Sequence, residues 1–193
     1  VRHGSQWLGV LGLADQPRLE ARDGLVRLRE IGLRPLVMLT GDNSRVAKAM
    51  ADTVGLTDFR ADLMPEQKVD AIKELLEKYG QVAMVGDGVN DAPALANATV
   101  GIAMGAGGTD VALETGDVAL MSDDLSRLPF AVALSRQSKR IIRQNLFISL
   151  GVIALLMPAT LLGLANIAVA VIFHEGSTLV VVGNALRLLR FRS

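Results

Sequence analysis

Two carboxylates and an amide lie in one short glycine-flanked segment, which is the stretch of the chain best suited to chemistry. Residues 82–95 read VAMVGDGVNDAPAL, so Asp87, Asn90 and Asp91 follow directly on a β-branched apolar run. Such a run predicts a buried strand, and ligands bind at the carboxyl ends of strands in an open α/β sheet. Carboxylate oxygens on a tight loop suit Mg²⁺, which proteins hold with one or two carboxylates plus phosphate. The alternative is a surface turn, since Asp-Gly and Asn-Asp are common turn dipeptides.

A second polar loop and a lysine can join this site. Thr40-Gly41-Asp42 follows another apolar run, and Lys68 lies near the start of a predicted helix. Because loops after parallel strands gather at one edge of a sheet, we expect these groups to lie near the acidic loop. A hydroxyl and backbone N–H groups can hold phosphoryl oxygens, and a lysine can neutralise their charge. Taken alone, Thr40 could be a helix-capping residue and Lys68 a solvent-exposed surface lysine. Together they predict phosphoryl transfer.

The elements that position these loops alternate between strands and helices. Strands are predicted at 7–13, 34–39, 82–85, 99–104 and 117–121. Helices are predicted at 19–31, at 45–54 with Ser44 as its cap, at 65–78, from about residue 92, and at 109–114. This order predicts an α/β fold with a parallel, Rossmann-like sheet covered by helices on both faces.

The composition excludes several other classes of protein. Among the 193 residues, 20 are acidic and 20 are basic, and this balance argues against a nucleic-acid binder. The absence of cysteine excludes a disulfide framework and a cysteine-based metal site. The chain begins at Val1 with neither an initiator Met nor a signal peptide, so we expect a piece of a longer protein.

The apolar residues are concentrated after Asn145 and predict two membrane helices. A helix over 125–145 leads into two apolar runs of spanning length, 146–164 and 167–189, with a short break between them. Basic residues lie beside the outer ends of both runs, which predicts a multi-pass protein of the cell membrane with both ends in the cytoplasm. These residues are Lys139, Arg140, Arg143, Arg190 and Arg192. A helical hairpin buried in a soluble core is the alternative.

His174 and Glu175 lie inside the second apolar run. Ionisable groups inside a membrane helix are costly, so they indicate a functional site. Imidazole and carboxylate suit borderline divalent metals such as Zn²⁺, Co²⁺ or Fe²⁺. The alternative is that the two side chains hydrogen-bond to one another or to neighbouring helices.

Several segments together resemble the later signature motifs of P-type ATPases, which share the haloacid-dehalogenase-like phosphorylation domain. These segments are MLTGDN, the lysine of MPEQK, MVGDGVNDAPALA and VGIAMGAGGTDVALETGDVALMSDDL. The resemblance implies ATP as substrate and Mg²⁺ as cofactor, with Asp87 and Asp91 at the magnesium ion. It also implies that Lys68 neutralises the phosphoryl group. The other residues that it places in the catalytic site are Thr40, Gly41, Asp42 and Asn90.

One part of the family pattern is missing. The nucleophilic Asp-Lys-Thr-Gly-Thr motif does not occur here, so we expect it upstream of Val1 and expect no aspartyl-phosphate on this chain alone. By the resemblance, residues 1–124 are the C-terminal part of the phosphorylation domain, 125–145 a cytoplasmic linking helix and 146–193 a transmembrane hairpin. The implied partners are the lipid bilayer and the rest of the same pump: its nucleotide-binding domain, actuator domain and earlier membrane helices.

The sequence HEGST followed by Asn184 resembles the final helix of heavy-metal, P1B-type ATPases, in the subgroup for cobalt and related divalent ions. The Asp-x-Gly pattern usual in zinc and cadmium pumps is absent, so Co²⁺, Zn²⁺ and Cd²⁺ all stay open. The leading hypothesis is a divalent-metal exporter. A membrane-anchored phosphatase would need an Asp-x-Asp nucleophile, which neither Asp15 nor Asp23 provides. A non-catalytic accessory subunit is disfavoured by the intact set of site residues.

Overall fold

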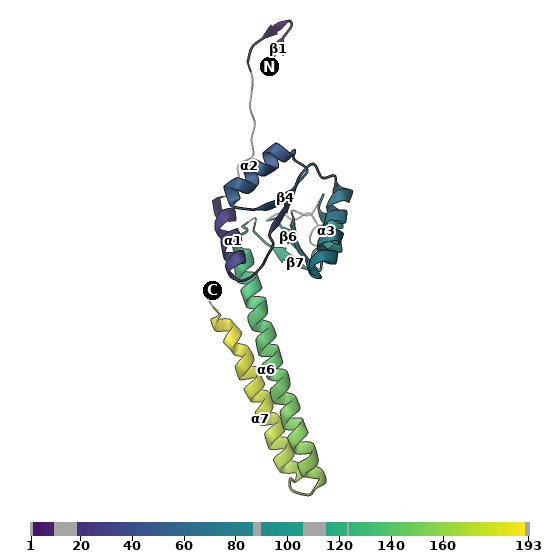
Figure 1. Cartoon of the computed structure of the whole chain (residues 1–193). Coiled ribbons are helices and arrows are strands. Elements are labelled where there is room, and N and C mark those ends of the chain that lie inside the picture. The colour runs from purple at the N-terminus through teal and green to yellow at the C-terminus, as the bar shows by residue number, and fades with distance from the viewer. Residues whose placement is uncertain (1, 10–18, 87–89, 106–114, 123, 192–193) are drawn as a thin grey trace. The chain divides into compact units, whose positions relative to one another are not determined.

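The computed structural model describes residues 2–9, 19–86, 90–105, 115–122 and 124–191. The chain divides into two units, Val1–Arg127 and Leu128–Ser193 (Figure 1). The first unit contains the strands, and the second consists of two long helices and a short 3₁₀ helix. The finer domain boundaries expected from the sequence, at 124 and 145, stay predictions.

Parallel strands form the centre of the first unit, in two separate ladders. β3 (Val37–Leu39) pairs with β4 (Asp58–Arg60). β5 (Ala83–Gly86) pairs with β6 (Val100–Met104), which in turn pairs with β7 (Val118–Leu120). Every one of these pairings is parallel, which confirms the α/β fold predicted from the alternation of strands and helices.

Two strand predictions need correction. The sequence analysis missed β4, because three residues reading Asp-Phe-Arg give no apolar period. At the start of the chain, β1 (Arg2–His3) and β2 (Gln6–Trp7) form a short antiparallel hairpin. The strand predicted over 7–13 is therefore wrong at Leu8 and Gly9, which are not in a strand. Its remainder lies outside the described residues, as does the helix predicted at 109–114.

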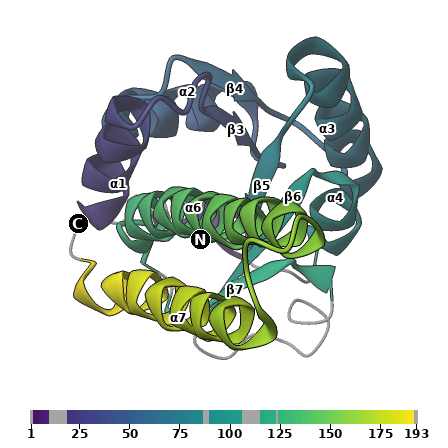
Figure 2. The same ribbon diagram turned by 90° about the horizontal axis from the view of Figure 1, so that it is seen from below.

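In the described part of the first unit, four helices cover the strands. α1 (Leu19–Glu30) and α2 (Ser44–Val54) lie on one side, and α3 (Pro65–Tyr79) and α4 (Ala92–Asn97) lie on the other (Figure 2). The apolar face of α3 meets α4 and β5 in a core whose buried members are Ile72, Met84, Ala94 and Leu95. This core places the start of α3 and the start of α4 together at the carboxyl end of β5.

The start of α2 differs from the prediction, and the difference matters because the Thr40 loop leads into it. Asn43, and not Ser44, caps the helix: its backbone is extended (φ −65°, ψ 155°) and its Oδ1 accepts a hydrogen bond from the Val46 N–H at 3.1 Å. Ser44 is already the first helical residue. Gly55 ends the helix with a left-handed backbone, φ 79°, as the sequence predicts.

The second unit is a helical hairpin. α6 (Arg127–Leu161) runs unbroken through the position where the predicted linking helix and the first apolar run meet. α7 (Ile167–Ala185) returns beside it and continues as a 3₁₀ helix, η1 (Leu186–Arg190) (Figure 1). Both helical segments are long and apolar enough to cross a membrane, and none of their most apolar stretch is buried. By length and composition the two segments are therefore candidate membrane spans.

Asp124 organises the turn that leads into α6. Its Oδ1 accepts a hydrogen bond from the Ser126 N–H at 2.9 Å, and its Oδ2 lies 3.4 Å from Nε of Arg127. Hydrogen bonds from the Ser126 side chain and backbone, followed by the charge of Arg127, lower the pKa of Asp124 below its ordinary value of 3.8. A lowered carboxyl pKa stabilises the fold above pH 3.8, and this stabilisation is lost as the pH falls through the folded-state pKa.

We expect Asn43→Ala to destabilise α2 by about 1 kcal/mol, because one helix N–H then loses its hydrogen-bond partner. Hydrogen exchange of the α2 amides in the full chain should become about fivefold faster. Asn43→Asp is the matched control, since it keeps the accepting oxygen and should leave the exchange nearly unchanged. Equal exchange in Asn43→Ala and the unmodified chain would show that the cap contributes nothing.

Candidate active site

The loop after β3 is folded on itself by the side chain of Thr40. Its Oγ1 donates to Oδ2 of Asp42 at 3.1 Å and accepts from the Asp42 N–H, also at 3.1 Å. Thr40 is half-buried, whereas Gly41 and Asp42 are exposed. The loop therefore presents a hydroxyl and a carboxylate next to each other at the carboxyl end of a parallel strand.

Backbone hydrogen bonds fasten this loop to the segment that leads into α3. The Thr40 N–H donates to the Arg60 carbonyl at 3.0 Å, and the Leu63 N–H donates to the Thr40 carbonyl at 3.1 Å. The Asp62 N–H donates to the Asp42 carbonyl at 2.7 Å, with Asp62 itself in a left-handed conformation, φ 56°. The position of the first turn of α3 is thereby tied to the position of the Thr40 loop.

Lys68, in the first turns of α3, forms an ion pair with Asp91. Lys68 Nζ lies 2.7 Å from Asp91 Oδ1, and the two side chains are only 16% and 15% exposed. Asp91 is the residue immediately before α4, and its carbonyl accepts the Leu95 N–H at 2.8 Å. The sequence analysis placed both residues at one edge of the sheet, and the structure brings them into direct contact.

Gly86, the last residue of β5, allows Asp91 to reach that position. A Cβ atom at residue 86 would lie 2.7 Å from Asp91 Oδ2 and 2.8 Å from Asp91 Cβ. Real Cβ atoms essentially never approach other heavy atoms so closely, so any larger side chain would displace the carboxylate. The sequence analysis noted the glycine only as the end of a strand. The Gly-Asp-Gly spacing was the available signal that backbone and side chain approach closely here.

The other predicted site residues are less fully placed. Asn90 is exposed in the turn before Asp91, and Asp87 lies outside the described residues. Within the described part of the chain, no hydrogen bond or ion pair joins the Thr40 loop directly to the Lys68–Asp91 pair. Their connection runs through the backbone of residues 60–63 and the first turn of α3.

The donor atoms at this edge fit Mg²⁺. Lys68 occupies one oxygen of the Asp91 carboxylate, which leaves the second oxygen for a ligand. Among the described residues, no cluster of three or more acidic or histidine side chains could enclose a metal ion. That is compatible with Mg²⁺, which keeps several waters and needs only one or two protein carboxylates beside a phosphate.

Comparison with known proteins agrees with this geometry. The sequence profile of the haloacid dehalogenase-like hydrolases matches residues 1–99, which carry the Thr40 loop, Lys68 and Asp91. The chain belongs to the haloacid dehalogenase-like hydrolase family.

Similarity to P-type ATPases extends beyond that segment. A cadmium-transporting ATPase of Staphylococcus aureus is 45% identical over 185 residues, which are 96% of this chain and 25% of that protein. A zinc-transporting ATPase of Bacillus subtilis (strain 168) is 50% identical over 190 residues, 98% of this chain and 30% of that protein. The crystal structure of a zinc-transporting PIB-type ATPase in its E2.Pi state matches with a TM-score of 0.83 and 45% identity, covering 91% of this chain and 28% of that one. This member of the hydrolase family thus spans between a quarter and a third of these relatives.

His174 and Glu175 lie outside the hydrolase segment, in the middle of α7. The helix continues through them, so the two consecutive side chains point about 100° apart. The hydroxyls of Ser177 and Thr178 both donate to the His174 carbonyl, at 2.7 and 3.2 Å. Within the described hairpin the two residues meet no further metal-binding side chain. Their role as ligands stays a prediction.

We expect Gly86→Ala to separate Asp91 from Lys68, because the new methyl group would occupy the space of the carboxylate. Overpacking of this kind costs about 1–3 kcal/mol. Hydrogen exchange of the α4 amides in the full chain should accelerate accordingly, since Asp91 precedes that helix. Gly151→Ala is a suitable control, because a Cβ there would meet nothing within 4 Å. Unchanged α4 exchange in Gly86→Ala would disprove the close contact.

Proposed function

We propose that this chain is part of an ATP-driven exporter of divalent heavy-metal cations. The observation that carries the proposal is the Lys68–Asp91 pair, 2.7 Å apart and mostly buried at the carboxyl end of β5. A cation held beside a carboxylate at that edge suits a phosphoryl group and its metal, since phosphoryl transfer depends on positioning and charge stabilisation. The same chain carries an unburied apolar hairpin, and that combination favours a membrane transporter over a soluble phosphatase.

The activity is proposed for a longer protein. The relatives named above are between three and four times as long as the part that this chain matches, and no Asp-Lys-Thr-Gly-Thr sequence occurs among its residues. The nucleophile, the nucleotide-binding and actuator domains and further membrane helices are the partners that the proposal requires. In that protein ATP would be the substrate, and an aspartyl-phosphate the intermediate.

The arrangement of the strands suggests where the nucleophile would lie. Among the described strands, β3 pairs only with β4, and β5 pairs only with β6. β3 and β5 each therefore have an edge with no described partner, and these are the strands whose loops carry Thr40 and lead to Asp91. A parallel strand inserted between them would join the two ladders and bring its own carboxyl end between the two loops. We propose that the nucleophilic aspartate ends such a strand.

The residues of the chain then have separate roles. Lys68 would neutralise phosphoryl oxygens, and its attachment to Asp91 fixes where its charge lies. The Thr40 hydroxyl, which donates to Asp42 in this structure, can turn to donate to a phosphoryl oxygen instead. Asp87 and Asp91 would hold Mg²⁺, whose charge stabilises the phosphate during transfer. Asn90 would help to orient the loop between them.

The hairpin supports a location in the cell membrane, with α6 and α7 as two spans. Lys139, Arg140 and Arg143 precede the apolar part of α6, and Arg187 and Arg190 follow that of α7. Basic residues are retained on the cytoplasmic side, so both ends of the hairpin would lie there. The first unit would then be cytoplasmic, where ATP is available.

The transported metal is a separate question. The two named relatives are called cadmium- and zinc-transporting, whereas HEGST and Asn184 suggested a cobalt-like subgroup. We propose a divalent ion of this group, Co²⁺, Zn²⁺ or Cd²⁺, with Glu175 offsetting its charge and His174 favouring borderline metals over Mg²⁺ and Ca²⁺. Because the two side chains diverge on α7, further ligands would come from other membrane helices.

Asp87→Asn in the full-length protein should abolish formation of phosphoenzyme from ATP, because Mg²⁺ loses a charged ligand. The measurement is acid-stable incorporation of the γ-phosphate. Asp70→Asn is the control, since Asp70 is an exposed carboxylate on α3 and should leave incorporation unchanged. The 193-residue chain alone should incorporate none. Ordinary phosphoenzyme levels in Asp87→Asn, or phosphoenzyme on the isolated chain, would refute the proposal.

His174→Ala in the full-length protein should remove stimulation of ATP hydrolysis by Co²⁺, Zn²⁺ or Cd²⁺. Phosphorylation from inorganic phosphate should survive, because that reaction uses only the cytoplasmic site. Glu175→Ala should behave in the same way. If both variants keep full metal stimulation, the HEGST segment is structural and the metal ligands lie elsewhere.

A further inference from the structure

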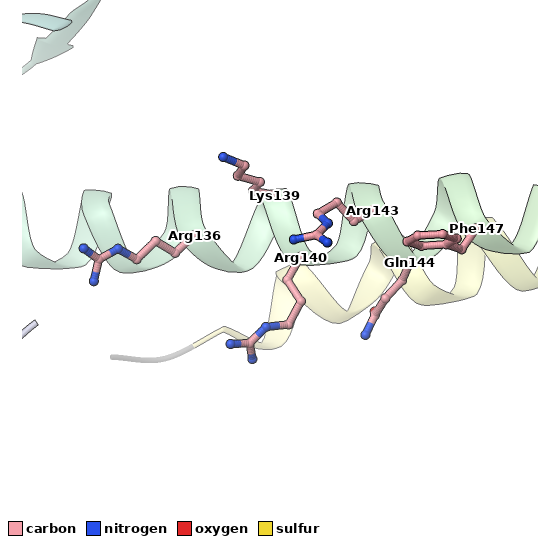
Figure 3. Close-up of a pocket in the computed structure, with 6 residues that line it drawn as sticks. All are labelled: Arg136, Lys139, Arg140, Arg143, Gln144 and Phe147. Atoms are coloured by element: carbon pink, nitrogen blue, oxygen red, sulfur yellow. The ribbon is translucent and has the colours of Figure 1, made fainter. Parts of the chain in front are cut away.

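A row of basic side chains lines a pocket of about 370 Å³ on the surface of α6 (Figure 3). On an ideal helix the six lining residues fall within an arc of about 140°. Lys139 extends to one side of the ribbon, and Arg140 and Gln144 to the other. All six are exposed: Arg136, Lys139, Arg140, Arg143, Gln144 and Phe147. We call this surface the basic stripe.

The positive charge of the basic stripe is not balanced within its own unit. Residues 128–193 contain a single acidic residue, Glu175, and it lies near the middle of α7. Lys139, Arg140 and Arg143 form no ion pair with any other residue that the structure describes. Three neighbouring cations on one exposed helix face repel each other, so their arrangement suits an anionic partner supplied from outside.

The position of the basic stripe along α6 matches one layer of a membrane. The almost uninterrupted apolar run begins at Leu146, and Phe147 is the aromatic residue at its edge. Arg143 precedes Leu146 by about 5 Å along the helix axis and Lys139 by about 10 Å, at 1.5 Å per residue. The polar layer on each side of a bilayer is about 5–8 Å thick, so Arg143 lies at the depth of the lipid headgroups. Lys139 and Arg140 lie just outside this layer, and their long side chains can extend along the helix to reach it.

The returning helix adds charge at the same level. Nδ2 of Asn184 donates to Oδ1 of Asn145 at 2.8 Å and to Oε1 of Gln144 at 3.2 Å, which fixes the register of α7 against α6. Arg187, which donates to Asn184 Oδ1 at 2.8 Å, therefore lies beside the basic stripe. These hydrogen bonds between α6 and α7 thus hold basic residues of both helices at a similar level along the hairpin.

We propose that the basic stripe binds the headgroups of anionic phospholipids. The inference rests on the proposed membrane insertion of the hairpin but adds a lipid class that the exporter proposal does not require. Guanidinium and ammonium groups would donate hydrogen bonds to lipid phosphate, while Phe147 lies against the upper acyl chains. A lipid bilayer fits better than a free phosphate, because the stripe continues directly into the apolar face.

The test uses the 193-residue chain in nanodiscs of phosphatidylcholine and phosphatidylglycerol in a 7:3 ratio. Native mass spectrometry measures which lipids stay bound after the disc is removed. Phosphatidylglycerol should be enriched over its share of the disc, and enrichment should fall when the salt concentration is raised. Each basic residue near an anionic surface contributes about a fivefold preference. Lys139→Gln, Arg140→Gln and Arg143→Gln together should therefore reduce the ratio of bound phosphatidylglycerol to bound phosphatidylcholine by at least about tenfold.

Two control variants distinguish the effect of where the positive charge lies from the effect of how much charge the chain carries. Arg22→Gln, Arg27→Gln and Lys73→Gln together remove the same charge from exposed sites in the first unit and should leave lipid enrichment unchanged. Arg140→Lys with Arg143→Lys keeps the charge of the stripe and should keep the enrichment. Inorganic phosphate at millimolar concentration should not compete. Competition would identify a soluble phosphate site and overturn the lipid proposal.

Insertion is tested separately by a reporter fused after Ser193. If the unmodified chain does not insert, the membrane part of the proposed function fails. If it inserts but phosphatidylglycerol is not enriched, the lipid proposal is wrong and the exporter proposal stands. If the triple glutamine variant fails to insert, the proposal is tested by the salt dependence measured on the unmodified chain. Phosphatidylglycerol enrichment that does not change with salt concentration would then overturn the lipid proposal.

Discussion

The ion pair between Lys68 and Asp91 is the contact on which the first unit depends most. Lys68 belongs to α3, whose start is fastened to the Thr40 loop, and Asp91 belongs to the turn between β5 and α4. Both side chains are mostly buried, so solvent and salt screen their attraction less than they would screen an exposed pair. The pair therefore ties the turn after β5 to α3, and through the start of α3 to the Thr40 loop.

Much of this arrangement could be predicted from the sequence, because it follows from local patterns. The apolar run before Asp87, the proline at the start of α3 and the glycine after α2 each indicate an element without reference to the rest of the chain. Parallel strands then bring their loops to one edge, so Lys68 and Asp91 could be expected near each other. The resemblance to the family motif predicted roles for these residues, which periodicity alone could not do.

The features that were missed depend on contacts between distant segments. β4 has only three residues and no apolar period, and it exists because its backbone pairs with β3. The choice of Asn43 over Ser44 as the cap depends on which residue has the extended backbone. The need for glycine at position 86 comes from a side chain five residues later that folds back over it. The position of Arg187 along α6 likewise depends on the hydrogen bonds that Asn184 makes with Asn145 and Arg187.

The continuity of α6 has a mechanical consequence. Its 35 residues make a rod about 50 Å long, and Pro158 falls within its last turn, so most of its length lacks a natural hinge. A rod of this kind does not absorb a tilt applied at one end. Turning its Arg127 end by about 5° would move the other end by about 4–5 Å. A small rotation at one end thus becomes, at the other, a displacement close to the rise of one helical turn, about 5.4 Å.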